Sequence, residues 1–295
     1  MGAIMKTNLA FIVSGMILIT AVAMTACTEE TALPAKKTNQ VGFEYIYPEK
    51  AVHQQIYKEL KERHTLENLQ KFLSPFRLRW PLTLSLAECD GEADAMYSYD
   101  IITICYEYIE ALQKNMPAAT TPAGVEPIDT IAGPFMDTVL HEFAHALFDT
   151  IDIPILGREE DAADQVSAYI YLQLGKEEAR RLIMGAAYAY MLEIQDAGPP
   201  SMEVLANEHS TSEQRVFNLL CIAYGADPEL FEDLATLGGL PKERAEFCEE
   251  EYELIAYAYQ TLIGPHIDPD LAKKIFDSSW LPEKTSRALR KQELN

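Results

Sequence analysis

Hydrophobic residues recur with two different periods in the first third of the chain. Residues 42–48 (GFEYIYP) alternate aromatic and polar positions as a short strand does, whereas residues 50–76 space Leu and Ile as one face of a helix does. Residues 77–107 return to alternation, with Asp90-Gly91 and Tyr99-Asp100 supplying turn residues. This part of the chain therefore predicts a strand, a helix and a small antiparallel sheet.

Beyond Pro134 almost every segment has helical spacing. A stretch rich in Pro, Ala, Thr and Gly (115–134) precedes these segments and predicts a long surface loop. The fold class expected is α+β, a small antiparallel sheet or hairpin followed by a mainly helical body, in one domain over 43–295. The predicted helices are 135–149, 158–174, 176–196, 211–224, 228–237, 241–263 and 269–277.

The N-terminus has the pattern of an export signal. Residues 1–27 contain a short apolar run and end in Thr25-Ala26-Cys27. This ending resembles the bacterial lipoprotein signal, which implies a lipid on Cys27 and anchoring in the cell envelope. Thr28 at the next position favours the outer membrane, facing the periplasm, and residues 28–42 read as a flexible tether. An ordinary signal cleaved after Ala26 is the alternative.

The net charge restricts the possible binding partners, and the cysteines indicate which bonds an oxidising compartment would allow. The formal net charge of −22 argues against nucleic acid as a direct partner. Four cysteines follow Cys27, and in an oxidising compartment they can form two disulfides in three possible pairings. Cys89 and Cys105 flank the predicted hairpin, and Cys221 and Cys248 sit on two helical segments, so we favour these two pairs. A zinc cluster is the competing use, but no CxxC occurs.

The motif with the clearest chemistry is His141-Glu142-Phe143-Ala144-His145, inside an amphipathic stretch. Four residues turn a helix by about 400°, so both imidazoles project from nearly one face and can bind one zinc ion. Glu142 lies about 100° round the helix, where it can reach a water beside the metal without being a ligand. Core histidines on an apolar helix are the alternative, and the neighbouring segments decide between the two.

A catalytic zinc needs a third protein ligand. Asp149 continues the histidine face, but it lies about 12 Å along the helix axis from His141, too far to share the ion. Pro154 and Gly157 break the helix and allow the chain to reverse into residues 158–164 (REEDAAD). The third ligand is therefore expected from that acidic segment.

Glu160 and Asp164 share a helical face. Glu160 can then bind the metal while Asp164 accepts the free ring N–H of a ligand histidine. Glu159 points elsewhere and is the second candidate for the third ligand. An acidic helix N-terminus that suits the macrodipole is the alternative for all three carboxylates.

The combination of HEFAH, fourteen intervening residues and EDAAD resembles the gluzincins, zinc peptidases whose third ligand is a glutamate. The separation of the two motifs is shorter than in thermolysin-like and membrane-associated relatives. A closer resemblance, from about Cys89 to Tyr252, is to a little-described bacterial family of predicted metallopeptidases. It is carried by AEC, ITICYEY, HEFAHALFD, LGREEDAADQ, EHSTSEQR and LLCIAYGADP. The resemblance implies a zincin-like domain with a Zn²⁺ cofactor that hydrolyses peptide bonds.

In such a site Glu142 can take a proton from water and pass it to the leaving amine. A second donor to the developing oxyanion is expected in residues 208–215 (EHSTSEQR). His209 is the first candidate and Arg215 the second, as a donor or as a clamp on a substrate carboxylate. Helix capping by Ser210 or Ser212 beside a surface histidine is the alternative.

Two further features are candidates for substrate contact. Tyr97, Tyr99 and Tyr106 lie in the predicted sheet, although tyrosines more often pack a sheet than serve chemistry. The strand near Ile101 to Cys105 is close in sequence to the motif, and we expect it to pair with an extended peptide.

Two functions follow from these expectations. The first is a zinc peptidase acting on peptides or proteins in the envelope. The alternative is a zinc-containing lipoprotein with little or no catalysis that serves as a binding or assembly module. Glu142 favours the enzyme, because a purely structural zinc site does not need it. A structural lipoprotein without metal is disfavoured by the two motifs together.

Overall fold

The sheet joins strands that are far apart in the sequence. The computed structural model describes residues 40–236 and 239–281. The strands Val41–Tyr45 (β1), Leu82–Ala87 (β2), Ala95–Ser98 (β3) and Ile101–Cys105 (β4) form one sheet in the order β1-β2-β4-β3. β1 and β4 run parallel to β2, and β3 pairs with β4 antiparallel. The antiparallel prediction for residues 77–107 is therefore right for β3 with β4 and wrong for β2, and the predicted strand at 42–48 joins the sheet as β1.

The parallel pairing has a simple cause. Parallel neighbours need a long crossover, usually helical, and the chain between β1 and β2 supplies it with α1 (Ala51–Glu62) and α2 (Thr65–Phe72). α2 contacts β1, and α1 contacts α2 and α3 (Tyr106–Lys114). The predicted single helix over 50–76 is thus two helices, separated by His64 in the left-handed conformation.

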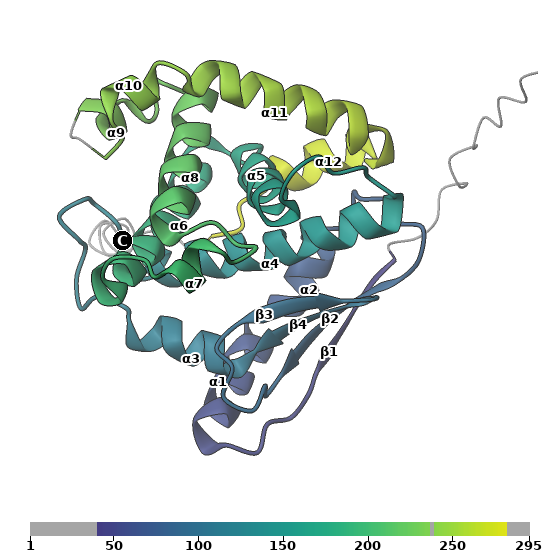
Figure 1. Ribbon diagram of the computed structural model, residues 1–295. Coiled ribbons are helices and arrows are strands. Elements are labelled where there is room, and N and C mark those ends of the chain that lie inside the picture. Colours follow the sequence, from purple (N-terminus) through teal and green to yellow (C-terminus); the bar gives the residue numbers. More distant parts are fainter. Residues whose placement is uncertain (1–39, 237–238, 282–295) are drawn as a thin grey trace, which may run out of the picture. The chain divides into compact units, whose positions relative to one another are not determined.

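Apart from the sheet and connecting loops, the described chain is helical, so the predicted α+β class with a mainly helical body is confirmed (Figure 1). The short α7 and α10 were not predicted as separate helices. The remaining helices are α4 (Asp129–Ile151), α5 (Glu159–Leu172), α6 (Lys176–Ala197), α7 (Met202–Leu205), α8 (Ser212–Ala226), α9 (Glu232–Thr236), α10 (Lys242–Ala245), α11 (Cys248–Leu262) and α12 (Pro269–Phe276).

α4 lies between the sheet and the other long helices (Figure 1). It contacts β3 and β4 on one side and α5 and α6 on the other. Phe143 of α4 is fully buried, and its ring centroid lies 4.9 Å from that of Phe76. Because α4 carries the HExxH motif, this packing fixes the motif between the sheet edge and α5.

The start of α4 was predicted too late. The helix begins at Asp129 rather than at residue 135, and Pro134 lies inside it. Arg181 of α6 holds the first turn, with Nη2 2.7 Å from Oδ1 of Asp129. Gly133 packs so closely on α6 that a Cβ there would lie 2.5 Å from the backbone nitrogen of Ala186. These long-range contacts outweigh the local tendency of proline to end a helix.

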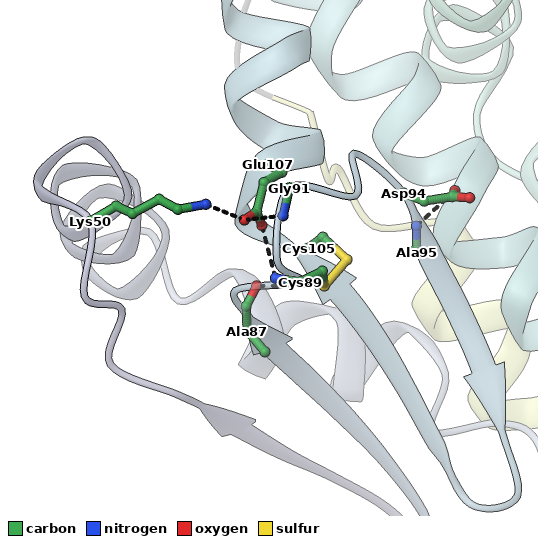
Figure 2. The surroundings of a disulfide bond; sticks show 8 residues. All are labelled: Lys50, Ala87, Cys89, Gly91, Asp94, Ala95, Cys105 and Glu107. Carbon is green, nitrogen blue, oxygen red and sulfur yellow. Dashed lines mark hydrogen bonds and ion pairs between the residues drawn. A yellow bond between two sulfur atoms is a disulfide. The ribbon is translucent and has the colours of Figure 1, made fainter.

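Both predicted disulfides are present. Cys221 of α8 bonds to Cys248 of α11, and Cys89 bonds to Cys105 at the end of β4. Beside the Cys89–Cys105 disulfide, the carboxylate of Glu107 accepts hydrogen bonds from the backbone N–H of Cys89 and Gly91 (Figure 2). The disulfide and this carboxylate fix the turn that leads into β3.

Within residues 40–236 and 239–281, no helix has both the length and the apolar character needed to cross a bilayer. The predicted export signal at 1–27, with Cys27, and most of the predicted tether at 28–42 lie outside these ranges.

Candidate metal centre

Two imidazoles of α4 lie side by side. His141 and His145 are one helical turn apart, and their Nε2 atoms are 3.1 Å from each other. Little of either side chain is exposed, 6% for His141 and 13% for His145. The motif therefore forms the single-face pair that its spacing predicts, in a largely desolvated position.

α5 brings a carboxylate to both rings. Asp152 and Gly157, both in the left-handed conformation, reverse the chain between α4 and α5. Oε2 of Glu160 then lies 3.0 Å from Nε2 of His141 and 3.3 Å from Nε2 of His145. Ligand atoms at ordinary zinc distances in a tetrahedral site are about 3.3 Å apart. These three atoms, called the donor cluster below, have spacings close to that value.

The far nitrogen of each ring faces a second carboxylate. Oδ1 of Asp164 lies 2.7 Å from Nδ1 of His141, and Oε1 of Glu159 lies 2.8 Å from Nδ1 of His145. An ionised carboxylate only accepts, so each Nδ1 donates. Glu160, rather than Glu159, thus faces both Nε2 atoms, and Glu159 orients His145.

The electrostatics of the donor cluster suit a cation. Burial lowers the pKa of His141, but its hydrogen bonds with Asp164 and Glu160 outweigh burial and raise that pKa to about 10. The same bond from His141 lowers the pKa of Glu160 to about 2. Three electron-pair donors this close would repel one another without a positive charge, which a proton or a divalent cation supplies. Two imidazoles and one carboxylate are a donor set that zinc accepts.

His209, in the segment before α8, lies next to the donor cluster. Its Nε2 lies 2.9 Å from Oε2 of Glu160, and its Nδ1 and backbone N–H both face Oδ1 of Asn207. Donor atoms of His141, Glu160 and His209 lie within 4.8 Å of one another, so His209 is an alternative to His145 as the second imidazole ligand. We favour His145 as the ligand, because its Nε2 is close to both other donors. The cap of α8 is Thr211, rather than Ser210 or Ser212.

Glu142 lies beside the donor cluster without joining it. Its Oε2 accepts a hydrogen bond from the backbone N–H of Tyr97, at 2.6 Å. Burial raises the pKa of Glu142, against the lowering effect of His141 and His145. A partly buried carboxylate with a raised pKa, held against the sheet edge, has the properties of a general base.

Arg215 occupies a different place from either predicted role. Its Nε and Nη2 donate to the two oxygens of Asp164, at 2.8 and 2.7 Å. The guanidinium also lies over the Tyr190 ring, 4.8 Å from its centroid. The Nε–Nη2 edge of the guanidinium is directed at both oxygens of Asp164, so the geometry favours a positioning role over a clamp on a substrate carboxylate.

A buried carboxylate that sequence reasoning missed extends this network. Asp137 is 7% exposed, and it accepts hydrogen bonds from the hydroxyls of Tyr171, Tyr190 and Ser167. It precedes His141 by one helical turn on the same face. An acidic residue on the apolar face of a helix was the available signal, because such a group needs partners when buried.

The sheet edge at the site is β3, not the predicted strand at Ile101 to Cys105. β4 has β2 on one side and β3 on the other, so its backbone groups are already paired. Cys105 N–H donates to Asp94 O, which makes residues 94, 96 and 98 the hydrogen-bonded positions. The backbone groups of Ala95 and Tyr97 therefore point outward.

The three candidate tyrosines differ in burial and in their position relative to the cavity. Tyr106 is fully buried and donates to Ile46 O, and Tyr99 is 86% exposed. Tyr97 lines the cavity that contains the donor cluster, and its hydroxyl donates to Oδ2 of Asp149, at 2.7 Å. Asp149, which we judged too distant to bind the metal, thus fixes a side chain of the sheet edge.

The donor cluster opens into a cavity of about 650 Å³. Residues of β3, α4, α5 and the 208–215 segment line it. Asp94 and Glu208 are lining residues that the sequence did not single out. No local pattern marks them, because their proximity depends on how distant segments pack.

Comparison with known proteins agrees with this geometry. A family model described as "Putative metallopeptidase" matches residues 45–263. No curated protein and no solved structure matches the chain. Since the matched range covers most of the sequence and includes the whole donor cluster, the protein belongs to this family.

Proposed function

We propose that the protein is a zinc-dependent peptidase of the cell envelope. His141, His145 and Glu160 hold the zinc, and Glu142 acts as the general base. The observation that carries the proposal is the convergence of two Nε2 atoms and Oε2 of Glu160 within 3.3 Å, with Glu142 in the same cavity. Membership of a metallopeptidase family supports it.

In the proposed reaction, the bound metal and Glu142 have different roles. When bound, zinc supplies Lewis-acid chemistry, by acidifying water and polarising the scissile carbonyl. Glu142 accepts the proton of the attacking water and returns it to the leaving amine. The raised pKa of Glu142 suits both steps, since the group must be protonated between them.

Other residues bind and orient. His209 donates a hydrogen bond to the developing oxyanion. Asp164 and Glu159 hold the two ligand rings through Nδ1, and Arg215 holds Asp164. The outward carbonyls of Ala95 and Tyr97 accept hydrogen bonds from an extended substrate, since the N–H groups of these residues donate to Asp94 and Glu142.

Zinc stoichiometry of the purified mature domain is the first test. Wild-type protein is expected to bind one equivalent, and Glu160→Ala to lose it. Glu159→Ala is the matched comparison, because this neighbouring carboxylate lies 2.8 Å from Nδ1 of His145 and outside the donor cluster, so it is expected to keep the equivalent of zinc at saturating concentration. Equal retention in both variants would refute Glu160 as a ligand.

Hydrolysis separates the enzyme from the alternative of a binding or assembly module. Glu142→Gln keeps the donor cluster and is expected to retain zinc while losing at least a hundredfold in kcat. Removal of zinc with a chelator should abolish hydrolysis, and added Zn²⁺ should restore it. Zinc-loaded wild-type protein that cleaves no member of a peptide library would support the module instead.

The location in the envelope is part of the proposal. It is supported by the Thr25-Ala26-Cys27 ending of the apolar N-terminal run. Cys27→Ala is expected to release the protein from the membrane fraction and to prevent incorporation of a labelled fatty acid. Unchanged membrane association of the variant would contradict a lipid on Cys27.

A further inference from the structure

The cavity contains carboxylates that the proposed chemistry does not use as ligand or base. Asp94, directly before β3, and Glu208, next to His209, line it and are exposed. Glu159 also lines it, and its side chain is 54% exposed. The site itself is defined by the donor cluster, and these three residues determine the charge that a ligand meets there.

The charges of the other groups in and around the cavity balance one another. A divalent cation would be balanced by Glu160 and Glu142. Arg215 is paired with Asp164, with Nη2 2.7 Å from Oδ1. Asp94, Glu159 and Glu208 are further carboxylates of the lining, and none of them forms an ion pair with a Lys or Arg of the described chain. The lining therefore stays negative with the metal bound.

The described lining offers no unpaired Lys or Arg for a substrate carboxylate. Arg215 is the single Lys or Arg among the lining residues, and its Nε and Nη2 both donate to Asp164. A carboxylate on the substrate would thus face Asp94, Glu159 and Glu208 without an unpaired Lys or Arg beside it. A cationic side chain would find up to three acceptors.

Asp94 is placed where an extended substrate would run. Its Oδ1 accepts a hydrogen bond from the backbone N–H of Ala95, at 2.8 Å, one of the outward groups of β3 (Figure 2). The Cys89–Cys105 disulfide fixes the preceding turn. The carboxylate is therefore held beside the edge that would pair with a peptide backbone.

We propose that this cavity selects peptides with a Lys or Arg side chain close to the scissile bond, and that Asp94 and Glu208 determine the preference. The inference rests on the proposed peptidase function. It excludes recognition of a free C-terminal carboxylate as the main source of specificity. Charge pairs at a solvent-accessible site are screened by salt, so the preference should weaken as ionic strength rises.

The test uses capped fluorogenic peptides that differ only by Lys, Gln or Glu at positions flanking one bond. Their N-termini are acetylated and their C-termini amidated, so the side chain is the sole variable charge. Zinc-loaded wild-type protein is expected to cleave the Lys peptide with a kcat/KM at least tenfold above that of the Gln peptide. Asp94→Asn with Glu208→Gln should reduce this ratio below about threefold.

A matched control removes the same charge elsewhere. Glu253 of α11 and Asp270 of α12 are exposed and do not line the cavity. Glu253→Gln with Asp270→Asn should leave the ratio of Lys to Gln cleavage within about twofold of wild type. A fall equal to that of the Asp94 and Glu208 variant would show that net charge, rather than the cavity, sets the preference, and would overturn the proposal.

Binding to Glu142→Gln protein separates this inference from the peptidase function. Fluorescence anisotropy with the same peptides reports selection without hydrolysis. Tighter binding of the Lys peptide without cleavage by wild type would uphold the selection and reject the peptidase. Cleavage of the Gln peptide with no preference for Lys, in either assay, would overturn the selection and leave the peptidase standing.

Discussion

Asp164→Asn tests whether the residue behind a proposed ligand sets metal affinity. Oδ1 of Asp164 accepts from Nδ1 of His141 and from Nη2 of Arg215, both at 2.7 Å, and Oδ2 accepts from Nε of Arg215. An asparagine places an NH₂ group where one oxygen accepts, so at least one charge-assisted bond is lost. The ring of His141 is then less firmly oriented and less basic at Nε2.

The expected loss follows from these bonds. A hydrogen bond to a charged group contributes about 1.5–3 kcal/mol, and loss of a partner behind a metal ligand typically weakens affinity about 10- to 100-fold. Asp164→Asn should therefore raise the zinc Kd about 10- to 100-fold, equivalent to about 1.4–2.7 kcal/mol. The affinity is measured by competition with a chromophoric chelator at fixed pH, with circular dichroism to confirm folding.

Asp161→Asn is the matched control on the same helix. Asp161 accepts from the hydroxyl of Ser210, at 2.6 Å, and an asparagine oxygen can still accept this bond. Its zinc Kd should stay within about twofold of wild type. A folded Asp164→Asn protein with unchanged Kd would refute the reasoning, as would an equal loss in Asp161→Asn.

Three further predictions concern the scaffold. Although burial opposes it, the hydrogen bond from Lys50 lowers the pKa of Glu107 to about 2, from an ordinary value of 4.5. Its stabilisation is therefore present above about pH 4.5 and lost towards pH 2, so Glu107→Gln should cost about 2 kcal/mol at pH 7 and flatten the acid side of urea-unfolding curves. Replacing both Cys221 and Cys248 with Ala removes a disulfide that closes a loop of sequence separation 27, and it should lower the unfolding free energy by about 3.5 kcal/mol. Under reducing conditions the wild type lacks this disulfide as well, so the same replacement should not cause this loss. Gly185→Ala places a Cβ against the first turn of α4 and should lower the unfolding free energy by about 1–3 kcal/mol, and an unchanged urea midpoint would contradict the close packing of α4 and α6.

Helical spacing made much of the site predictable from sequence. His141 with His145, and Glu160 with Asp164, are pairs four residues apart, and an α-helix places such pairs on one face whatever surrounds it. The break at Pro154 and Gly157 indicated that α5 could fold back on α4. The structure accordingly brings these four side chains together.

Features set by long-range pairing were not predictable in the same way. Which strand lies at the edge depends on the sheet order, and alternation along β3 and β4 is equally compatible with either strand at the edge. The residue that Arg215 contacts depends on how α8 packs against α5. Pro134 inside α4 was missed because the contacts of Asp129 and Gly133 with α6 are invisible to local propensity.

The positions 137, 141, 145 and 149 form one polar stripe along α4. Asp137 is held by buried hydroxyls, His141 and His145 belong to the donor cluster, and Asp149 fixes Tyr97 of the sheet edge. Asp137, His141 and His145 are buried or half-buried with partners, as polar groups that leave water require, and Asp149 at the end of the stripe is exposed. One helix face thus links the interior, the proposed metal site and the edge that would bind substrate. A shift of α4 along its axis would disturb all three together, so its tight contact with α6 is expected to matter for zinc affinity as well as for stability.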